Sequence, residues 1–286
     1  MLAQPNSSGI PDPATTAVVI LGASEWPDAV QFEPAPQFAN SARDFIKYIC
    51  APSGYNLDGK THLLNLFDSD DEQSVIVRKI ADFLLKLRRN LGEAGRSLTD
   101  VITFYVGHGG FDTGSNSAYF LAIRKTNPID YLGSSLSASS LRRALREHAG
   151  SARHYLILDC CFAAAAVGPY IQMSAAVQGV IAQVQDSFPP SGTALLCAAG
   201  ALIPAKAKRD AEHTMFSEGL LDILNQGAPT AAESLSISDL AAAIRNELRI
   251  GMRTRQFAPR FTAQSSRRGV WQRSRYFATR GPRYKE

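Results

Sequence analysis

The sequence predicts an α/β protein with a mostly parallel central sheet and helices on both faces. Short continuous apolar runs, typical of strands buried on both faces, alternate with longer stretches in which apolar residues recur at helical spacing. This alternation is the pattern of strand–helix–strand units, which build parallel sheets. The chain has 286 residues, of which 45% are hydrophobic and 20% charged, and such a chain can bury a full core.

The first half of the chain predicts two strand–helix units. Residues 17–22 form a continuous apolar run that ends in glycine, and we expect the first strand there. Apolar residues at helical spacing from Phe38 to Ile49 predict a helix, which a proline and a glycine end. The second unit consists of a strand at 62–67 and an amphipathic helix over about 72–91.

The second half of the chain repeats this alternation. A third strand is expected over 98–106, where it runs into a glycine-rich turn. Ser137 is a suitable cap for a helix through His148, and residues 154–159 predict a fourth strand that ends at paired cysteines. The remaining predicted elements are a strand at 192–199 and helices at 215–225 and 238–248.

The composition of the chain indicates where the folded domain lies. Residues 1–16 contain neither a basic start nor an apolar stretch, so we expect a disordered lead rather than a secretion signal, and a cytoplasmic protein. The folded domain is predicted over 17–249. Within it, the uncharged run 162–185 is too rich in small and polar residues to span a membrane and is interpreted as a linker. Four cysteines are too few for a disulfide scaffold and are expected to be reduced thiols.

Residues 250–286 form a basic, aromatic C-terminal segment. It holds ten Lys or Arg residues and one acid, so the rest of the chain carries −5 of the total charge of +4. Large apolar side chains are interleaved with the arginines, which favours packing of this segment back on the acidic domain. Contact with nucleic acid, anionic lipid or an acidic partner is the alternative, but no recognition motif indicates nucleic-acid binding, and we expect no membrane association.

Two chemically active residues follow neighbouring strands of the predicted sheet. His108 and Cys161 lie 53 positions apart, each after an apolar strand. Because the carboxyl ends of parallel strands meet at one edge of a sheet, we expect the two side chains to lie close together. A histidine beside a cysteine can take the thiol proton and later protonate a leaving amine. The sequence therefore predicts a cysteine–histidine dyad at this edge.

Both segments resemble a known peptidase family. Residues 104–109 (FYVGHG) resemble the Tyr-x-Gly-His-Gly segment of caspases, metacaspases and paracaspases, and residues 156–162 (LILDCCF) resemble their Asp-x-Cys segment. The opening VVILGASEWPD and the later HTMFSEGLLDIL are similar to bacterial, especially actinobacterial, caspase-like proteins. The resemblance implies a caspase-like three-layer sandwich and a cysteine endopeptidase.

The resemblance also implies a role for each site residue. Cys161 would be the nucleophile and His108 the general base and acid, with the backbone N–H groups of Gly109 and Cys161 as the oxyanion hole. Gly109 is expected to let the backbone approach the substrate closely. Cys160, whose side chain points to the other face of its strand, is expected to pack in the core.

Acidic residues near the dyad predict the cleavage specificity. Asp159 stands where metacaspases carry an acid that lines the primary specificity pocket, which implies cleavage after Arg or Lys. Asp210 or Glu212 could supply a second acid, and Ser41 stands near the position of the second pocket aspartate of metacaspases. The alternative is that Asp159 only accepts hydrogen bonds from backbone donors at the end of its strand.

Metal and nucleotide sites find little support in the sequence. The glycines around His108 do not follow the dinucleotide-binding pattern, and the scattered histidines do not predict a zinc site. Asp68, Asp70, Asp71 and Glu72 form an acidic cluster that is interpreted as the solvated start of a helix, where carboxylates are favourable. We therefore expect no metal and no cofactor, and calcium as an activator, by analogy with metacaspases, is the alternative.

The expected protein is a cytoplasmic cysteine endopeptidase that acts on a protein or peptide substrate and has a regulatory protein partner. Its bacterial relatives imply a regulated effector in a defence or cell-death pathway. No Lys or Arg lies between Cys161 and Gly192, whereas Lys206, Lys208 and Arg209 follow, so activity is expected without linker cleavage. The alternative is a catalytically silent caspase-like scaffold that binds a protein or nucleic-acid partner through its basic tail.

Overall fold

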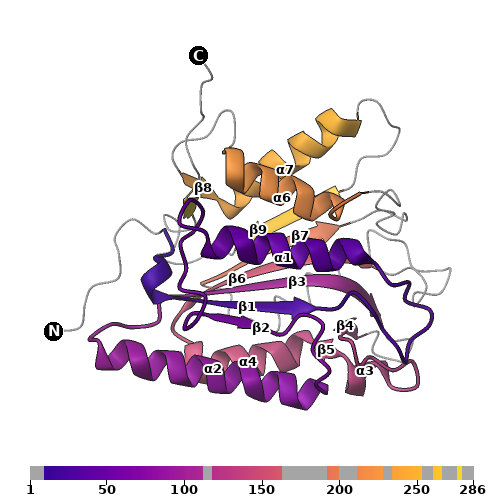
Figure 1. The fold of residues 1–286 in the computed structure, drawn as a ribbon, viewed down its shortest axis with the longest axis horizontal. Coiled ribbons are helices and arrows are strands. Elements are labelled where there is room, and N and C mark those ends of the chain that lie inside the picture. The colour runs from indigo at the N-terminus through magenta and orange to yellow at the C-terminus, as the bar shows by residue number, and fades with distance from the viewer. Residues whose placement is uncertain are drawn as a thin grey trace.

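A computed structural model describes the strands and helices that surround the predicted site (Figure 1). The linker expected after Phe162, the basic stretch 206–209 and Asp210 lie outside the described residues. The described residues are 10–111, 118–162, 192–199, 211–227, 234–252, 260–265 and 276–278.

The centre of the structure is an eight-stranded, mostly parallel sheet. Its strands are β1 (Thr16–Gly22), β2 (Leu63–Asn65), β3 (Asp100–Phe111), β4 (Tyr119–Leu121), β5 (Leu136–Ser137), β6 (Arg153–Phe162), β7 (Thr193–Ala199) and β9 (Arg260–Ser265). The main order is β2-β1-β3-β6-β7-β9, in which only the edge strand β9 is antiparallel to its neighbour. β4 pairs antiparallel with the end of β3, and β5 pairs with β4.

Helices cover both faces of this sheet and give the molecule three layers (Figure 1). The helices of one face are α1 (Pro36–Cys50), α6 (Met215–Gln226) and α7 (Ile237–Met252), those of the other are α2 (Gln73–Glu93) and α4 (Ala138–Ala149), and the short α3 (Tyr131–Ser134) precedes β5. Each face has its own buried cluster, with Phe45 and Leu220 in the first and Ile80 and Leu145 in the second. The predicted α/β fold with helices on both faces is confirmed.

The first strand shows why apolar runs form the central strands. All seven residues of β1 are buried, and alternate side chains enter opposite layers, Val18 on the α1 side and Val19 on the α2 side. Gly22 ends the strand with a φ of +125°, and a Cβ there would lie 1.8 Å from the carbonyl oxygen of Val106. Only glycine fits so close an approach at this backbone conformation.

Two strands are longer than the sequence predicts. The apolar run of β3 ends at Val106, yet the strand continues through Phe111 because β4 pairs with its last three residues. β6 likewise continues through Phe162, which pairs with Gly109 of β3. The expectation that His108 and Cys161 follow their strands is therefore wrong, since both lie within paired strand.

The described parts of the two terminal segments contact the domain. Pro13–Thr15 form a 3-10 helix capped by Asp12, whose carboxylate accepts a hydrogen bond from Ala14 N at 2.9 Å. The prediction that the disordered lead extends to residue 16 is wrong for this stretch. In the basic C-terminal segment, β9 extends the sheet beside β7, and β10 (Tyr276–Ala278) pairs antiparallel with β8 (Ser234–Ser236).

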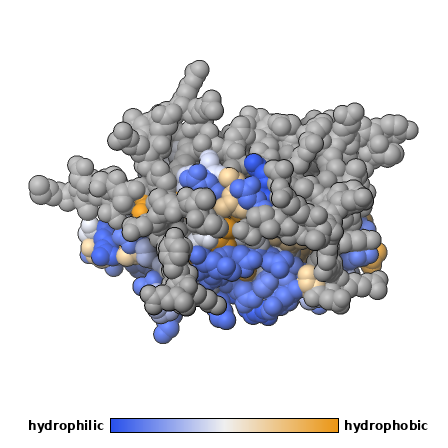
Figure 2. All heavy atoms as spheres, turned by 90° about the horizontal axis from the view of Figure 1, so that it is seen from above, coloured by the Kyte–Doolittle hydropathy of each residue, from blue (hydrophilic) through white to orange (hydrophobic). Residues whose placement is uncertain are grey.

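The described surface is mainly polar on the side of the molecule that Figure 2 shows. Figure 2 views the molecule from the side of α6 and α7, and the described surface in this view is mainly hydrophilic. Amphipathic helices of this kind place their apolar stripe on the sheet and their charged side chains in water. Among the helices of the described residues, none has the length and apolarity that a membrane span requires.

Candidate active site

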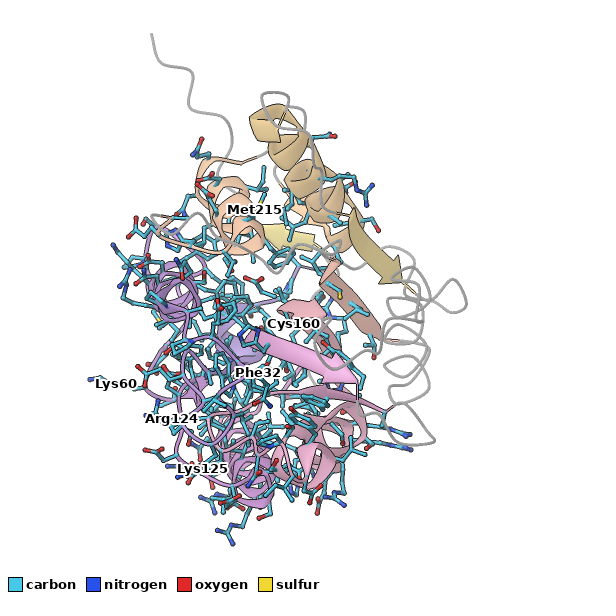
Figure 3. The ribbon with its side chains drawn as sticks, turned by 90° about the vertical axis from the view of Figure 1, so that its right-hand side faces the viewer. Phe32, Lys60, Arg124, Lys125, Cys160 and Met215 are labelled. Carbon is cyan, nitrogen blue, oxygen red and sulfur yellow. The ribbon has the colours of Figure 1, made fainter. Side chains whose placement is uncertain are left out.

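The register of β3 and β6 brings the two predicted dyad residues to neighbouring positions. The strands run parallel, with His108 paired with Cys161 and Val106 paired with Asp159. Adjacent strands lie about 4.8 Å apart, so the backbones of His108 and Cys161 are direct neighbours. Figure 3 views the molecule from the carboxyl ends of these strands, with Cys160 near the centre of the view. Parallel sheets bind their ligands at this edge.

Among the described residues, the aromatic rings of Trp26, Phe32 and Phe38 pack around the imidazole of His108. The ring centroid of Trp26 lies 4.5 Å from it, that of Phe32 lies 5.1 Å away in a stacked arrangement, and that of Phe38 lies 5.3 Å away with its edge toward the ring. All three aromatic side chains are buried. Trp26 and Phe32 come from the segment between β1 and α1, and Phe38 lies in the first turn of α1. This packing fixes the plane of the imidazole.

A backbone carbonyl selects the tautomer of His108. Its Nε2 lies 3.3 Å from the carbonyl oxygen of Glu33. A carbonyl oxygen can only accept, so Nε2 carries the hydrogen and Nδ1 is the basic nitrogen of the neutral ring. Burial lowers the pKa of His108 below its ordinary value, and the hydrogen bond to Glu33 opposes this. A neutral and oriented imidazole is the form that a general base requires.

Sequence reasoning does not find the residues that hold His108. Trp26, Phe32 and Glu33 lie in the segment 24–35, which has neither helical nor strand periodicity. The segment instead folds through two tight turns, in which Ala29 N donates to the Trp26 carbonyl and Phe32 N donates to the Ala29 carbonyl. The one signal available was the density of aromatic residues directly after a strand that ends at the site edge.

Cys160 packs in the layer opposite to Asp159. Its side chain is 2% exposed and belongs to the α2–α4 cluster, where its Sγ lies 3.0 Å from the hydroxyl of Tyr119. Asp159 contacts α6 on the other face. The expectation that Cys160 is a core residue is confirmed.

Gly109 lies against the strand that pairs with the end of β3. A Cβ at Gly109 would lie 2.1 Å from the hydroxyl oxygen of Tyr119, so the buried Tyr119 ring would have to shift to admit a side chain. In the structure, Tyr119 is the neighbour that favours glycine at position 109. The sequence instead predicts that this glycine lets the backbone approach the substrate. The role of the Gly109 N–H in an oxyanion hole stays a prediction.

Asp159 is a buried carboxylate held by the start of α6. It is 4% exposed, and its Oδ2 accepts hydrogen bonds from Thr214 Oγ1 at 2.5 Å and from Ser217 Oγ. Burial raises the pKa of Asp159 from 3.8 to about 6, while the two hydroxyl donors lower it. Thr214 caps α6, and its own N–H donates to the buried Ser41 at 3.2 Å. Among the described residues, the donors to Asp159 are thus the side-chain hydroxyls of Thr214 and Ser217, whereas the alternative interpretation expected backbone groups.

Glu212 connects the start of α6 with α1. Its side chain is exposed and lies 3.6 Å from Arg43, and its carbonyl accepts from Asn40 at 2.9 Å. The next residue, His213, bonds Asp44 through Nε2 at 2.8 Å. The Arg43 guanidinium is the main cause that lowers the pKa of Asp44 to about 2. Glu212 therefore lies on the outer side of α1, two residues before Thr214.

One group of potential metal ligands occurs among the described residues. The ligand atoms of Asp44, Glu212 and His213 lie within 4.8 Å of one another. Arg43 lies 3.1 Å from Asp44 and 3.6 Å from Glu212, so a protein cation already compensates both carboxylates. The cluster is accordingly an ion-pair network as it stands.

The acidic cluster at the start of α2 is tied to other parts of the protein. Both carboxylate oxygens of Asp68 accept hydrogen bonds from Ser24 at 2.7 Å. The other two aspartates make ion pairs instead, Asp70 with Arg124 at 3.1 Å and Asp71 with Lys79 at 2.5 Å. Asp68 thus differs from the solvated acid that the sequence suggests.

Comparison with known proteins identifies the fold. No family model and no curated protein matches the sequence. Among solved structures, the chain is similar to caspase-1 from Spodoptera frugiperda, with a TM-score of 0.57 and 9% identity over 100% of this chain and 98% of that one. It is also similar to protein GSU0716 from Geobacter sulfurreducens, with a TM-score of 0.51 and 14% identity over 91% of this chain and 97% of that one. The chain therefore has a caspase-like fold.

Proposed function

We propose that this protein is a cysteine endopeptidase in which Cys161 is the nucleophile and His108 is the general base and acid. The observation that carries the proposal is the pairing of His108 with Cys161 across β3 and β6, at the carboxyl edge of a caspase-like fold. The orientation of His108 supports it, because a bond from Nε2 to the Glu33 carbonyl leaves Nδ1 as the base.

The proposed reaction proceeds through a thioester. Nδ1 of His108 takes the thiol proton of Cys161, and the thiolate attacks the carbonyl carbon of the scissile peptide bond. The N–H groups of Gly109 and Cys161 stabilise the resulting oxyanion. The carbon–nitrogen bond then breaks, and the leaving amine takes the proton from His108. Water then gives a proton to His108 and its oxygen attacks the thioester carbonyl carbon. The carbon–sulfur bond breaks, the peptide leaves as a carboxylic acid, and the Cys161 thiolate takes the proton back from His108.

A preference for Arg or Lys before the cleaved bond is part of the proposal. Asp159 lies two residues before the nucleophile, and Thr214 and Ser217 hold its carboxylate at the start of α6. A buried carboxylate with a raised pKa gains from a cationic partner, which favours its charged form. Asp210 and Glu212 are the candidates for a second acid.

We further propose a regulated effector in a bacterial defence or cell-death pathway, located in the cytoplasm and controlled by a protein partner. The resemblance of the sequence motifs to bacterial caspase-like proteins supports this context, and the caspase-like fold is compatible with it. The enzyme needs no cofactor in this scheme. Calcium as an activator is tested by carrying out each assay with and without the ion.

The experiment that tests the proposal is hydrolysis of short fluorogenic peptides that end in Arg, Lys or Asp. We expect cleavage after Arg and Lys that falls by about a thousandfold or more in Cys161→Ala, as for loss of a catalytic nucleophile. Cys160→Ala is the matched control, because Cys160 is a buried core residue next in sequence, and it should keep the activity. Cleavage after Asp alone would contradict the role of Asp159.

The second candidate function is a silent scaffold that binds a partner through its basic C-terminal segment. The placement of β9, from this segment, at the edge of the sheet favours it, because an edge strand presents unpaired backbone groups to a partner. Absence of hydrolysis, together with absence of Cys161 labelling by an electrophilic peptide, would favour the scaffold over the peptidase.

A further inference from the structure

We propose that Asp68 is a positioning residue, which holds the segment 24–35 and through it the imidazole of His108. The proposal rests on the proposed function, because it concerns the base of the same dyad. Asp68 belongs to the acidic cluster before α2, and neither the fold nor the proposed reaction explains why an acid is present at this position.

Asp68 anchors the first residue of the segment through both carboxylate oxygens. Its Oδ1 accepts from Ser24 N and its Oδ2 accepts from Ser24 Oγ, each at 2.7 Å. Bonds to an ionised carboxylate are about twice as strong as neutral ones. The N–H of Asp68 donates to the Gly22 carbonyl at 3.0 Å, so the anchor is itself fixed to the end of β1.

Ser24 also binds the other end of the segment 24–35. The carbonyl of Ser24 accepts from Ala35 N at 2.9 Å, directly before α1 begins. A second contact supports the start of the segment, because Arg124 lies 3.2 Å from Glu25 and 3.1 Å from Asp70. The loop 24–35 is therefore closed on Ser24, and Asp68 holds that residue in place.

The closed loop supplies several of the contacts that the described residues make with His108. Trp26 and Phe32 supply two of the three rings around the imidazole, and Glu33 supplies the carbonyl that bonds Nε2. A shift of the loop would move all three together. Effective proton transfer requires the base within hydrogen-bond reach of its proton, and a displacement of about 1 Å can cost about 100-fold in rate.

The backbone of Asp68 allows the side chain to be tested separately from the fold. Asp68 has a φ of +54°, in the left-handed region that glycine and asparagine tolerate. Asp68→Asn can keep both contacts, with its oxygen accepting from Ser24 N and its amide donating to Ser24 Oγ. Asp68→Gly keeps the backbone conformation and removes the anchor. Asp71→Asn changes the charge of the same cluster away from Ser24 and is the matched control.

The first measurement is the pH dependence of Trp26 fluorescence, which needs no substrate. Trp271→Phe leaves Trp26 as the only tryptophan, and protonated imidazole quenches indole emission on contact. We expect emission to fall as His108 is protonated in the parent, in Asp68→Asn and in Asp71→Asn. The fall should be lost in His108→Gln and strongly reduced in Asp68→Gly, whose folding is checked by circular dichroism.

The second measurement is peptide hydrolysis by the same variants. We expect kcat of Asp68→Gly to fall by about 10- to 100-fold with KM within about threefold, because the base and not the substrate site is displaced. Asp68→Asn should restore kcat to near the parent value. If Asp68 were instead a calcium ligand, Asp68→Asn would bind calcium more weakly, and its kcat would stay low and lose its dependence on calcium. A low, calcium-independent kcat of Asp68→Asn would therefore overturn the proposal.

The two measurements distinguish failure of the positioning role of Asp68 from failure of the proposed peptidase function. Unchanged quenching and unchanged kcat in Asp68→Gly would overturn the positioning role and leave the peptidase intact. If no variant, the parent included, cleaves any peptide, but quenching is lost only in Asp68→Gly and His108→Gln, the positioning role stands and the peptidase fails. Loss of quenching in Asp71→Asn as well would overturn the positioning role, because the cluster charge and not the anchor would then be the cause.

Discussion

Replacing Asp159 by asparagine should stabilise the fold at neutral pH while removing cleavage after Arg and Lys. The carboxylate is buried and accepts hydrogen bonds from Thr214 and Ser217. Asparagine has nearly the same shape and keeps an oxygen that accepts from these hydroxyls, but it carries no charge at any pH. The substitution therefore isolates the cost of the buried charge.

The expected magnitude follows from the pKa of Asp159, which burial raises from 3.8 to about 6. At about 1.4 kcal/mol for each pKa unit, this difference corresponds to about 3 kcal/mol. Because the folded-state pKa is raised, the stability from Asp159 is fully present below pH 3.8 and is lost as the pH rises through about 6. Asp159→Asn should match the wild type at low pH and exceed it by up to about 3 kcal/mol above pH 7.

The assay is urea unfolding of both proteins at several pH values, followed by subtraction of the two free energies of unfolding. Subtraction removes the contributions of other titrating groups, such as the buried His154, whose pKa burial lowers to about 4. A difference that is independent of pH, or a less stable asparagine variant at neutral pH, would refute the reasoning. Retained cleavage after Arg would separately contradict the role of Asp159 in specificity.

Three further predictions concern the stability of the sheet and its strand ends. Gly22→Ala should lower the free energy of unfolding by about 3 kcal/mol or more, because the new Cβ would lie 1.8 Å from a backbone oxygen. The control is Gly95→Ala, where φ is +69° but no atom lies within 4 Å of the new Cβ. It should lose about 1 kcal/mol in the same urea unfolding experiment. Arg153→Met should cost about 3–5 kcal/mol by leaving the fully buried Asp100 without its cation, and a small loss in chemical denaturation would contradict this. Cys160→Ala should cost about 1–3 kcal/mol, because the buried Tyr119 hydroxyl loses the Cys160 thiol as a partner, and peptide hydrolysis should persist.

The elements that could be predicted from sequence are those whose pattern is long and regular. β1 and α1 follow from an apolar run and a helical periodicity that tertiary contacts do not override. Ser137 is the cap of α4, as expected, because its side chain can accept from the N–H of Ser140 without help from distant residues.

The features that could not be predicted depend on contacts between distant segments. β4 has three residues and forms by pairing with the end of β3 and with β5, so no local pattern marks it. The loop 24–35 takes its shape from Asp68, more than thirty residues away in sequence. The environment of Asp159 depends on Thr214 and Ser217, which no spacing rule connects with it. Positions of reactive residues could be read from the motifs, but the groups that orient them could not.

The most direct test of the proposed dyad is the mapping of covalent labelling by a peptide that ends in arginine and carries an electrophilic ketone. Intact mass and peptide mapping show which of the four cysteines reacts. We expect one label, on Cys161, and a rate that falls by about a hundredfold or more in His108→Ala, because the thiolate then lacks its base. Labelling of Cys50 or Cys197 instead, or an equal rate at Cys161 without His108, would contradict the dyad.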